Sequence, residues 1–188
     1  RLNLHPLWNK GGIMPDTFIK IATVTVGGAG AADITFTSIP STYTDLVVKL
    51  SSRGTVAALD GGNFCQFNGD TSNANYGFVQ LVGDGSTAGS TSAATTTGVL
   101  FQRNVGSTAT SNTFSNSEMY IPNYTSSNHK SVSNDGVTET NASTTIAGLA
   151  LVASIWRNTA AITSMKIFPG SGNFVQYTTA TLYGISKS

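Results

Sequence analysis

Short segments of alternating apolar and polar residues, separated by turn residues, run through most of the chain. Ile34 and Phe36 point to one side of an extended backbone, and the residues between and beside them are polar. Leu46, Val48 and Leu50 repeat the same spacing. A period of two is that of a half-buried β-strand, and Gly, Asn, Asp and Pro between the segments mark turns. The pattern therefore predicts a chain of short antiparallel strands.

About ten such segments follow one another at the spacing that is typical of a β-sandwich or barrel. The segment 144–157 fits both a helix and a strand, and its Thr-rich flanks favour a strand. No long helical pattern alternates with the strands, which argues against a parallel α/β sheet. We expect an all-β fold, an antiparallel β-sandwich that is jelly-roll-like. The expected strands lie at 17–26, 32–37, 43–53, 63–68, 76–82, 98–102, 114–121, 129–138, 144–157, 161–168 and 173–185.

Two kinds of connection are predicted between these strands. The stretch 83–97 contains only Gly, Ser, Thr, Ala and one Asp, and it is predicted to be a long loop. Asp70 and Asp84 stand in Asn-Gly-Asp and Gly-Asp-Gly sequences. These resemble fragments of calcium loops, but the full series of ligands is missing, so Asx-turns are the favoured interpretation.

Residues 1–16 differ from the rest and are predicted to be an extended N-terminal arm, followed by a single β-sandwich domain at 17–188. The first twelve residues contain no acidic side chain and break at a Gly pair. A remnant of an expression tag is the alternative interpretation. As a native arm, the segment would bind a partner or a neighbouring subunit through its apolar residues, which are Leu2, Leu4, Leu7 and Trp8.

Few residues are charged. Asp, Glu, Lys and Arg make up 10% of the chain, against roughly 25% in a typical soluble domain. Ser, Thr and Asn replace them, and a neutral surface suits the repeated packing of identical copies; a Thr-rich secreted β-protein is the alternative. The net charge is +1 and the basic residues are scattered, so a nucleic-acid partner is not expected. No apolar run has the length of a membrane span, and no signal peptide is recognised.

Catalysis is not expected. The two histidines, His5 and His129, are far apart, and no Gly-x-Ser-x-Gly motif accompanies the serines. The nine carboxylates form no recognisable pair for glycoside hydrolysis. Cys65 stands between aromatic residues and is predicted to be buried. We therefore predict no catalytic residue, no cofactor and no metal site.

Tyr124 is the one aromatic residue singled out as a candidate contact residue. Most aromatic residues stand at strand periodicity, which predicts core packing. Tyr124 stands instead in the polar stretch 122–128, which is predicted to be a loop. An aromatic ring on a loop suits a contact surface.

Four stretches of the sequence form a recognisable set. They are Ser-Ile-Pro-Ser-Thr-Tyr-Thr-Asp-Leu at 38–46, Glu-Met-Tyr-Ile-Pro-Asn-Tyr at 118–124, Ile-Trp-Arg-Asn-Thr-Ala-Ala-Ile-Thr-Ser at 155–164 and Phe-Val-Gln-Tyr-Thr-Thr-Ala-Thr-Leu-Tyr-Gly-Ile at 174–185. With these stretches, the chain from about residue 17 to 185 resembles β-sandwich structural proteins of tailed bacteriophages, common in phages of cyanobacteria. The resemblance implies a non-enzymatic role, as a head decoration (cement) protein or a tail-fibre module, and it brings no catalytic residues. The arm at 1–16 is outside the shared pattern.

From the resemblance and the short length we expect a head decoration protein on the outer surface of the capsid. Its partner would be the major capsid protein, which the arm would grip. The alternative is a tail-fibre or receptor-binding module that recognises host surface glycan through the stretch 83–97 or the loop of Tyr124. Either role favours a homo-oligomer, with a trimer expected first and a dimer next.

Overall fold

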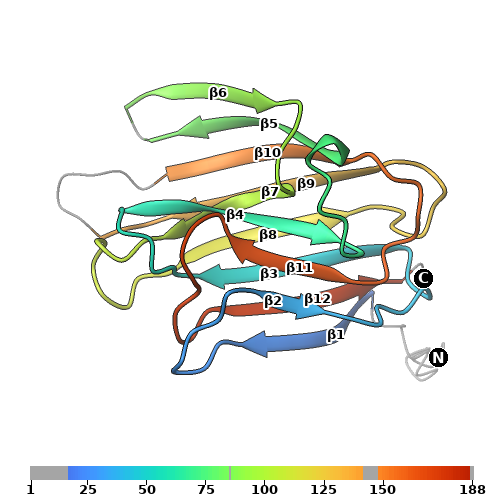
Figure 1. Ribbon diagram of the computed structural model, residues 1–188, viewed down its shortest axis with the longest axis horizontal. Coiled ribbons are helices and arrows are strands. Elements are labelled where there is room, and N and C mark those ends of the chain that lie inside the picture. Colours follow the sequence, from blue (N-terminus) through green and yellow to red (C-terminus); the bar gives the residue numbers. More distant parts are fainter. Residues whose placement is uncertain (1–16, 85, 142–147, 187–188) are drawn as a thin grey trace, which may run out of the picture.

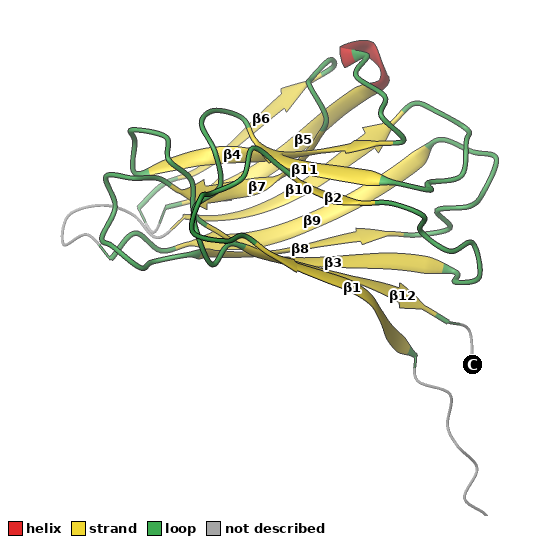
Figure 2. Cartoon of the chain, turned by 60° about the horizontal axis from the view of Figure 1, so that its bottom comes forward, coloured by secondary structure: helices red, strands yellow, loops and turns green. Residues whose placement is uncertain are grey.

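Two antiparallel β-sheets pack face to face (Figures 1 and 2). The computed structural model describes residues 17–84, 86–141 and 148–186. The large sheet has the order β1-β12-β3-β8-β9-β10-β5-β6, and the small sheet has the order β2-β11-β4-β7. The expectation of an all-β sandwich is confirmed. The strands are β1 (Phe18–Thr25), β2 (Ile34–Phe36), β3 (Asp45–Ser52), β4 (Asp60–Phe67), β5 (Tyr76–Gly83), β6 (Ala88–Ala93), β7 (Val99–Val105), β8 (Ser115–Ile121), β9 (Lys130–Thr138), β10 (Gly148–Trp156), β11 (Met165–Pro169) and β12 (Thr179–Ile185), with one 3₁₀ turn, η1 (Asn73–Asn75).

The path of the chain between the sheets is jelly-roll-like. The chain passes from β2 in the small sheet to β3 in the large sheet, and back to β4. The hairpin of β5 and β6 lies in the large sheet, β7 in the small sheet, and the meander of β8, β9 and β10 again in the large sheet. β11 then joins β2 and β4 in the small sheet. β1 and β12 widen the large sheet beyond β3, so this sheet is twice as wide as the small one.

The core lies between the sheets and follows the predicted alternation. Ile34 and Phe36 of β2 are buried, and so is every second residue of β3 from Leu46 onward. The Phe67 and Trp156 rings, from opposite sheets, lie 5.4 Å apart between centroids. Because each strand buries one face against the other sheet, the two sheets share one hydrophobic core.

Part of the interior is polar. Asn63 of β4 donates from Nδ2 to the Ser52 hydroxyl of β3 at 2.9 Å, and Ser52 pairs with Ser115 of β8 at 2.8 Å. Asn134 of β9 donates from Nδ2 to the carbonyl of Leu100 at 2.8 Å. Hydrogen bonds between buried polar groups are directional, so this cluster fixes how the two sheets face each other.

The prediction of a continuous loop at 83–97 is wrong, because β6 runs through its middle. Six residues of β6 pair with β5 in a regular register, from Phe78 opposite Ala93 to Gly83 opposite Ala88. Strand pairing uses backbone groups that every non-proline residue carries, so a segment of small polar residues can pair without showing an apolar pattern. The predicted turn at Asp84 is confirmed, because its carboxylate accepts hydrogen bonds from the backbone N–H groups of Ser86 and Thr87.

Candidate interaction surface

The outer face of the large sheet carries five large aliphatic side chains on three neighbouring strands. Leu149 of β10 lies opposite Val137 of β9, and Leu151 of β10 lies opposite Leu81 of β5. These four side chains and that of Val79 are 51–59% exposed. We call these five residues the apolar stripe. A contiguous apolar patch on a protein surface is typical of a binding site.

β10 is apolar on both of its faces, and this produces the stripe. Ala150, Val152 and Trp156 point into the core, whereas Leu149 and Leu151 point outward. Strands with one solvated face normally carry polar residues on that face. The outward leucines do not fill the core, and they stay exposed in the part of the chain that the structure describes.

The outer face over β1, β12, β3 and β8 is more polar, although the Phe18 ring of β1 meets the Tyr183 ring of β12 edge-on and Tyr120 of β8 is partly exposed. Thr23 of β1 and Thr181 of β12 pair through their hydroxyls at 3.0 Å. Lys49 of β3 forms an ion pair with Glu118 of β8, and the hydrogen bond from the ammonium to this carboxylate raises the pKa of Lys49. Asp135 of β9 lies between Glu118 and Leu151, at the border of the stripe. The aliphatic stripe therefore lies over β9, β10 and β5, whereas the hydroxyl pairs and the ion pair lie over β1, β12, β3 and β8.

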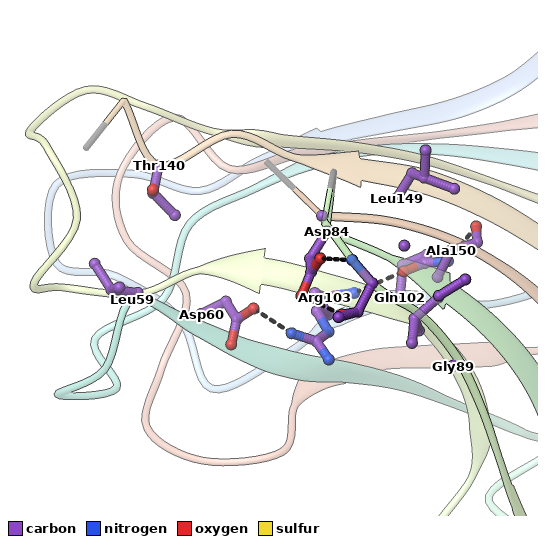
Figure 3. A pocket seen from close by; sticks show the side chains of 14 residues that line it. Leu59, Asp60, Asp84, Gly89, Gln102, Arg103, Thr140, Leu149 and Ala150 are labelled. Atoms are coloured by element: carbon purple, nitrogen blue, oxygen red, sulfur yellow. Dashed lines mark hydrogen bonds and ion pairs between the residues drawn. The ribbon is translucent and has the colours of Figure 1, made fainter. Parts of the chain in front are cut away.

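A pocket of about 360 Å³ opens at one end of the sandwich, between β5 and β10 of the large sheet and β4 and β7 of the small sheet (Figure 3). At the rim of this pocket, Asp60 accepts a hydrogen bond from Arg103 at 2.6 Å. Gln102 donates from Nε2 to the carbonyl of Ala150 at 2.8 Å and so crosses from one sheet to the other. Leu149, a residue of the stripe, also lines the pocket, which places the two features side by side.

The carboxylates at this pocket are already partnered. Asp60 is paired with Arg103, and Asp84 accepts hydrogen bonds from the backbone and side chains of Thr87 and Ser86, which lower the pKa of Asp84. A carboxyl group whose pKa is lowered, such as that of Asp84, is a poor general acid. Within residues 17–84, 86–141 and 148–186, no three His, Cys, Asp or Glu side chains gather in a way that could hold a metal ion.

The expectation that Tyr124 offers its ring to a partner is wrong for the folded chain. Tyr124 lies in the loop between β8 and β9, as predicted, but its side chain is fully buried in the core. Its hydroxyl donates to the carbonyl of Pro40, and burial raises its pKa. A large apolar ring with one polar end gains more by closing over the end of the sandwich than by remaining in water.

Other predicted residues lie in various surroundings. Cys65 is fully buried, as predicted, and burial raises the pKa of its thiol. His129 is exposed in the loop before β9. The carboxylate of Asp70 accepts from the backbone N–H of Ser72, which confirms the predicted Asx-turn. The four proposed contact residues of the arm lie outside the described residues, and they are Leu2, Leu4, Leu7 and Trp8.

Sequence reasoning missed the stripe, although a signal was present. The sequence Leu149-Ala150-Leu151-Val152 is apolar without a break, and such a run fits either a strand buried on both faces or one whose outer face is apolar. Only the sheet order shows that no strand or helix of the described chain covers this face (Figure 2).

Comparison with known proteins adds no relative to this picture: no family model, curated protein or solved structure matches the chain. In the part of the chain that the structure describes, no helix has the length and apolar character of a membrane span.

Proposed function

We propose that this chain is a non-enzymatic structural protein of a tailed-phage particle, a head decoration protein that binds the major capsid protein on the outer capsid surface. The observation that carries the binding role is the apolar stripe. The phage assignment rests on the resemblance of the four sequence stretches. A sandwich with one open, partly apolar sheet face suits a protein that lies flat on a shell.

The binding free energy of the apolar stripe would come from several small contributions spread over the sheet face. Full burial of one Val or Leu side chain contributes about 1.5–3 kcal/mol. The stripe residues are already about half buried, so each adds roughly 1 kcal/mol when a partner covers it. The low content of charged residues reduces the cost of removing water from the surrounding surface.

The arm is the second element of the proposal. Leu2, Leu4, Leu7 and Trp8 would add apolar contacts to the capsid protein, and Arg1 and Lys10 would pair with its carboxylates. Deletion of residues 1–12 is expected to weaken binding without changing the fold. Undiminished binding of the shortened chain would remove the arm from the proposal.

The experiment measures co-sedimentation of the purified chain with capsids assembled without it. The double variant L81S/L151S is expected to bind at least tenfold more weakly, because the stripe loses its two facing leucines. T23S/T181S is the matched control at the hydroxyl pair of β1 and β12 on the same face, and it should bind like the unchanged chain. Circular dichroism establishes that both variants are folded. Equal binding by both variants would show that the stripe is not the capsid contact.

A second candidate function is recognition of host surface glycan by a tail-fibre or receptor-binding module. The pocket beside the stripe favours it, because carboxylate, guanidinium and amide groups of Asp60, Arg103 and Gln102 line one concave site. Part of the stretch expected to contact sugar lies at this pocket, namely Gly83, Asp84, Thr87, Ala88 and Gly89. Electron cryo-microscopy of the particle separates the two functions: copies on the icosahedral shell support decoration, and copies only at the tail tip support receptor binding.

A further inference from the structure

β6 is an edge strand without the features that normally prevent pairing with another chain. It pairs with β5 alone, and Figure 1 shows it as the outermost strand of the large sheet. Its residues from Ala88 to Ser92 are exposed, and the strand contains no charge, no proline and no bulge. Natural proteins protect exposed edges with such features, because unpaired N–H and C=O groups accept a further strand.

The other three edge strands are protected. β1 carries Lys20 and a register shift beside it. β2 is three residues long. β7 contains a bulge at Gln102, where φ is 141°, and the exposed Arg103 follows it. Only β6 presents a regular, uncharged edge among the described strands.

The sequence around β6 reads almost the same in both directions. Residues 87–95 are Thr-Ala-Gly-Ser-Thr-Ser-Ala-Ala-Thr, with Thr91 at the centre. Read backwards, the stretch is the same except that Gly89 and Ala93 change places. In an antiparallel pair of identical strands centred on Thr91, each residue therefore meets its own kind or a residue of similar size. Ser90 would lie opposite Ser92 of the second copy, and Thr91 opposite Thr91.

The backbone N–H and C=O groups of β6 point in the directions that this register requires. The hairpin of β5 and β6 is closed by a hydrogen bond from Asp84 N to the carbonyl of Thr87, at 3.2 Å. Because backbone groups alternate sides along a strand, Thr91 then faces β5, whereas Ser90 and Ser92 direct their N–H and C=O groups away from the sheet. These outward groups are the ones that the register places opposite each other.

We propose that two copies of this chain pair antiparallel through β6, about a two-fold axis at Thr91, and join their large sheets into one continuous sheet. Hydroxyl pairs across the seam would continue a pattern that the large sheet already contains at Thr23–Thr181 and Thr25–Thr179. A closed two-fold pair uses the same edge twice and leaves no free β6 edge for further growth.

This pairing would turn both apolar stripes to the same side. The axis is perpendicular to the sheet, so the outer faces of the two copies form one surface. A dimer could then dock on a flat partner at two points at once, which raises avidity. The pairing itself is argued from the edge and does not depend on the proposed capsid role.

The experiment uses the full chain with Thr91→Cys under mild oxidation. Thr91 and its symmetry mate form the closer, non-hydrogen-bonded type of pair, with Cα atoms about 4.5 Å apart, which a disulfide can span. We expect a covalent dimer in high yield. Thr35→Cys, exposed on β2, is the matched control and should cross-link no faster than chance collision allows. The native Cys65 is fully buried and does not interfere.

A second variant tests the pairing without a cross-link. Ser90→Pro removes an outward N–H and leaves the bonds to β5 intact, so the chain should fold but stay monomeric in sedimentation equilibrium. Ser90→Ala should dimerise like the unchanged chain. A chain that is monomeric up to about 1 mM, or a dimer in which Thr91→Cys does not cross-link and Ser90→Pro has no effect, would overturn the proposal. Neither measurement involves capsids, so failure of the capsid proposal would leave this result unaffected.

Discussion

Arg53 is a buried cation that is held by backbone carbonyl groups. Its side chain at the end of β3 donates to the carbonyl oxygens of Thr110 and Ala109 at 2.8 and 3.0 Å. It also reaches the carbonyls of Thr113 and Ser107. No acidic side chain among the described residues pairs with it. One side chain therefore holds together the loop between β7 and β8. The planar guanidinium has five N–H donors, so it can bind several carbonyl groups at once.

Replacement of Arg53 by Met is expected to lower the free energy of unfolding by about 3 kcal/mol, because several buried carbonyls lose their donor. Urea denaturation measures this change. The control is Arg103→Met, which removes an exposed ion pair with Asp60 and should change stability by less than about 1 kcal/mol. Equal effects of the two variants would contradict the role of Arg53.

Asp70 connects the turn after β4 to the core through its carboxylate. Burial raises the pKa of Asp70, but hydrogen bonds from Trp156 Nε1, at 2.8 Å, and from the backbone of Ser72 outweigh burial, so the pKa lies below its ordinary value. Asn75 adds a further bond at 2.8 Å. The ionised form is thus the one that the fold stabilises.

A carboxyl group with a lowered pKa in the folded state stabilises the fold at pH values above its unfolded pKa. This stability is lost as the pH falls through the folded pKa. We expect the unchanged chain to lose stability as the pH falls below about 4, the ordinary pKa of an Asp carboxyl group, and Asp70→Asn to lose less. Denaturation at a series of pH values measures this. Asp135→Asn, at an exposed position, should keep the dependence of the unchanged chain.

At the scale of elements, β12 packs closely against the segment before β3. A Cβ atom at Gly184 would lie 2.2 Å from Cγ of the Tyr43 ring. Gly184 pairs with Leu46 of β3 and Ile19 of β1, so the backbone there is fixed from both sides. The ring of Tyr43 therefore covers β12 only because residue 184 has no side chain.

Gly184→Ala is expected to destabilise the chain by about 1–3 kcal/mol, because either the Tyr43 ring or the strand must move. The melting temperature measures this loss. Gly27→Ala is the matched control, since nothing lies within 4 Å of a Cβ atom there. A melting temperature of Gly184→Ala equal to that of the control would contradict this packing.

At the scale of the whole molecule, the two sheets are unequal in width, and this determines which surfaces remain open. β5 and β6 extend past the small sheet (Figure 1). The inner face of β5 is only half-buried at Phe78, Gln80 and Val82. The proposed contacts, the stripe and the β6 edge, both lie in this wide half. The architecture thus leaves for a partner the surfaces that the fold itself does not use.

The sequence by itself determined the strands of the core, because alternation is a local property and one residue shift exposes the wrong face. It predicted the turn at Asp70 and the burial of Cys65 for similar local reasons. Only the tertiary structure decided that residues 88–93 form a strand, that Tyr124 is buried, and that Leu81 and Leu151 are neighbours. The burial of Tyr124 and the meeting of Leu81 with Leu151 depend on segments distant in sequence. Residues 88–93 pair with the neighbouring strand β5, but they do so through backbone groups, which leave no trace in the side-chain pattern.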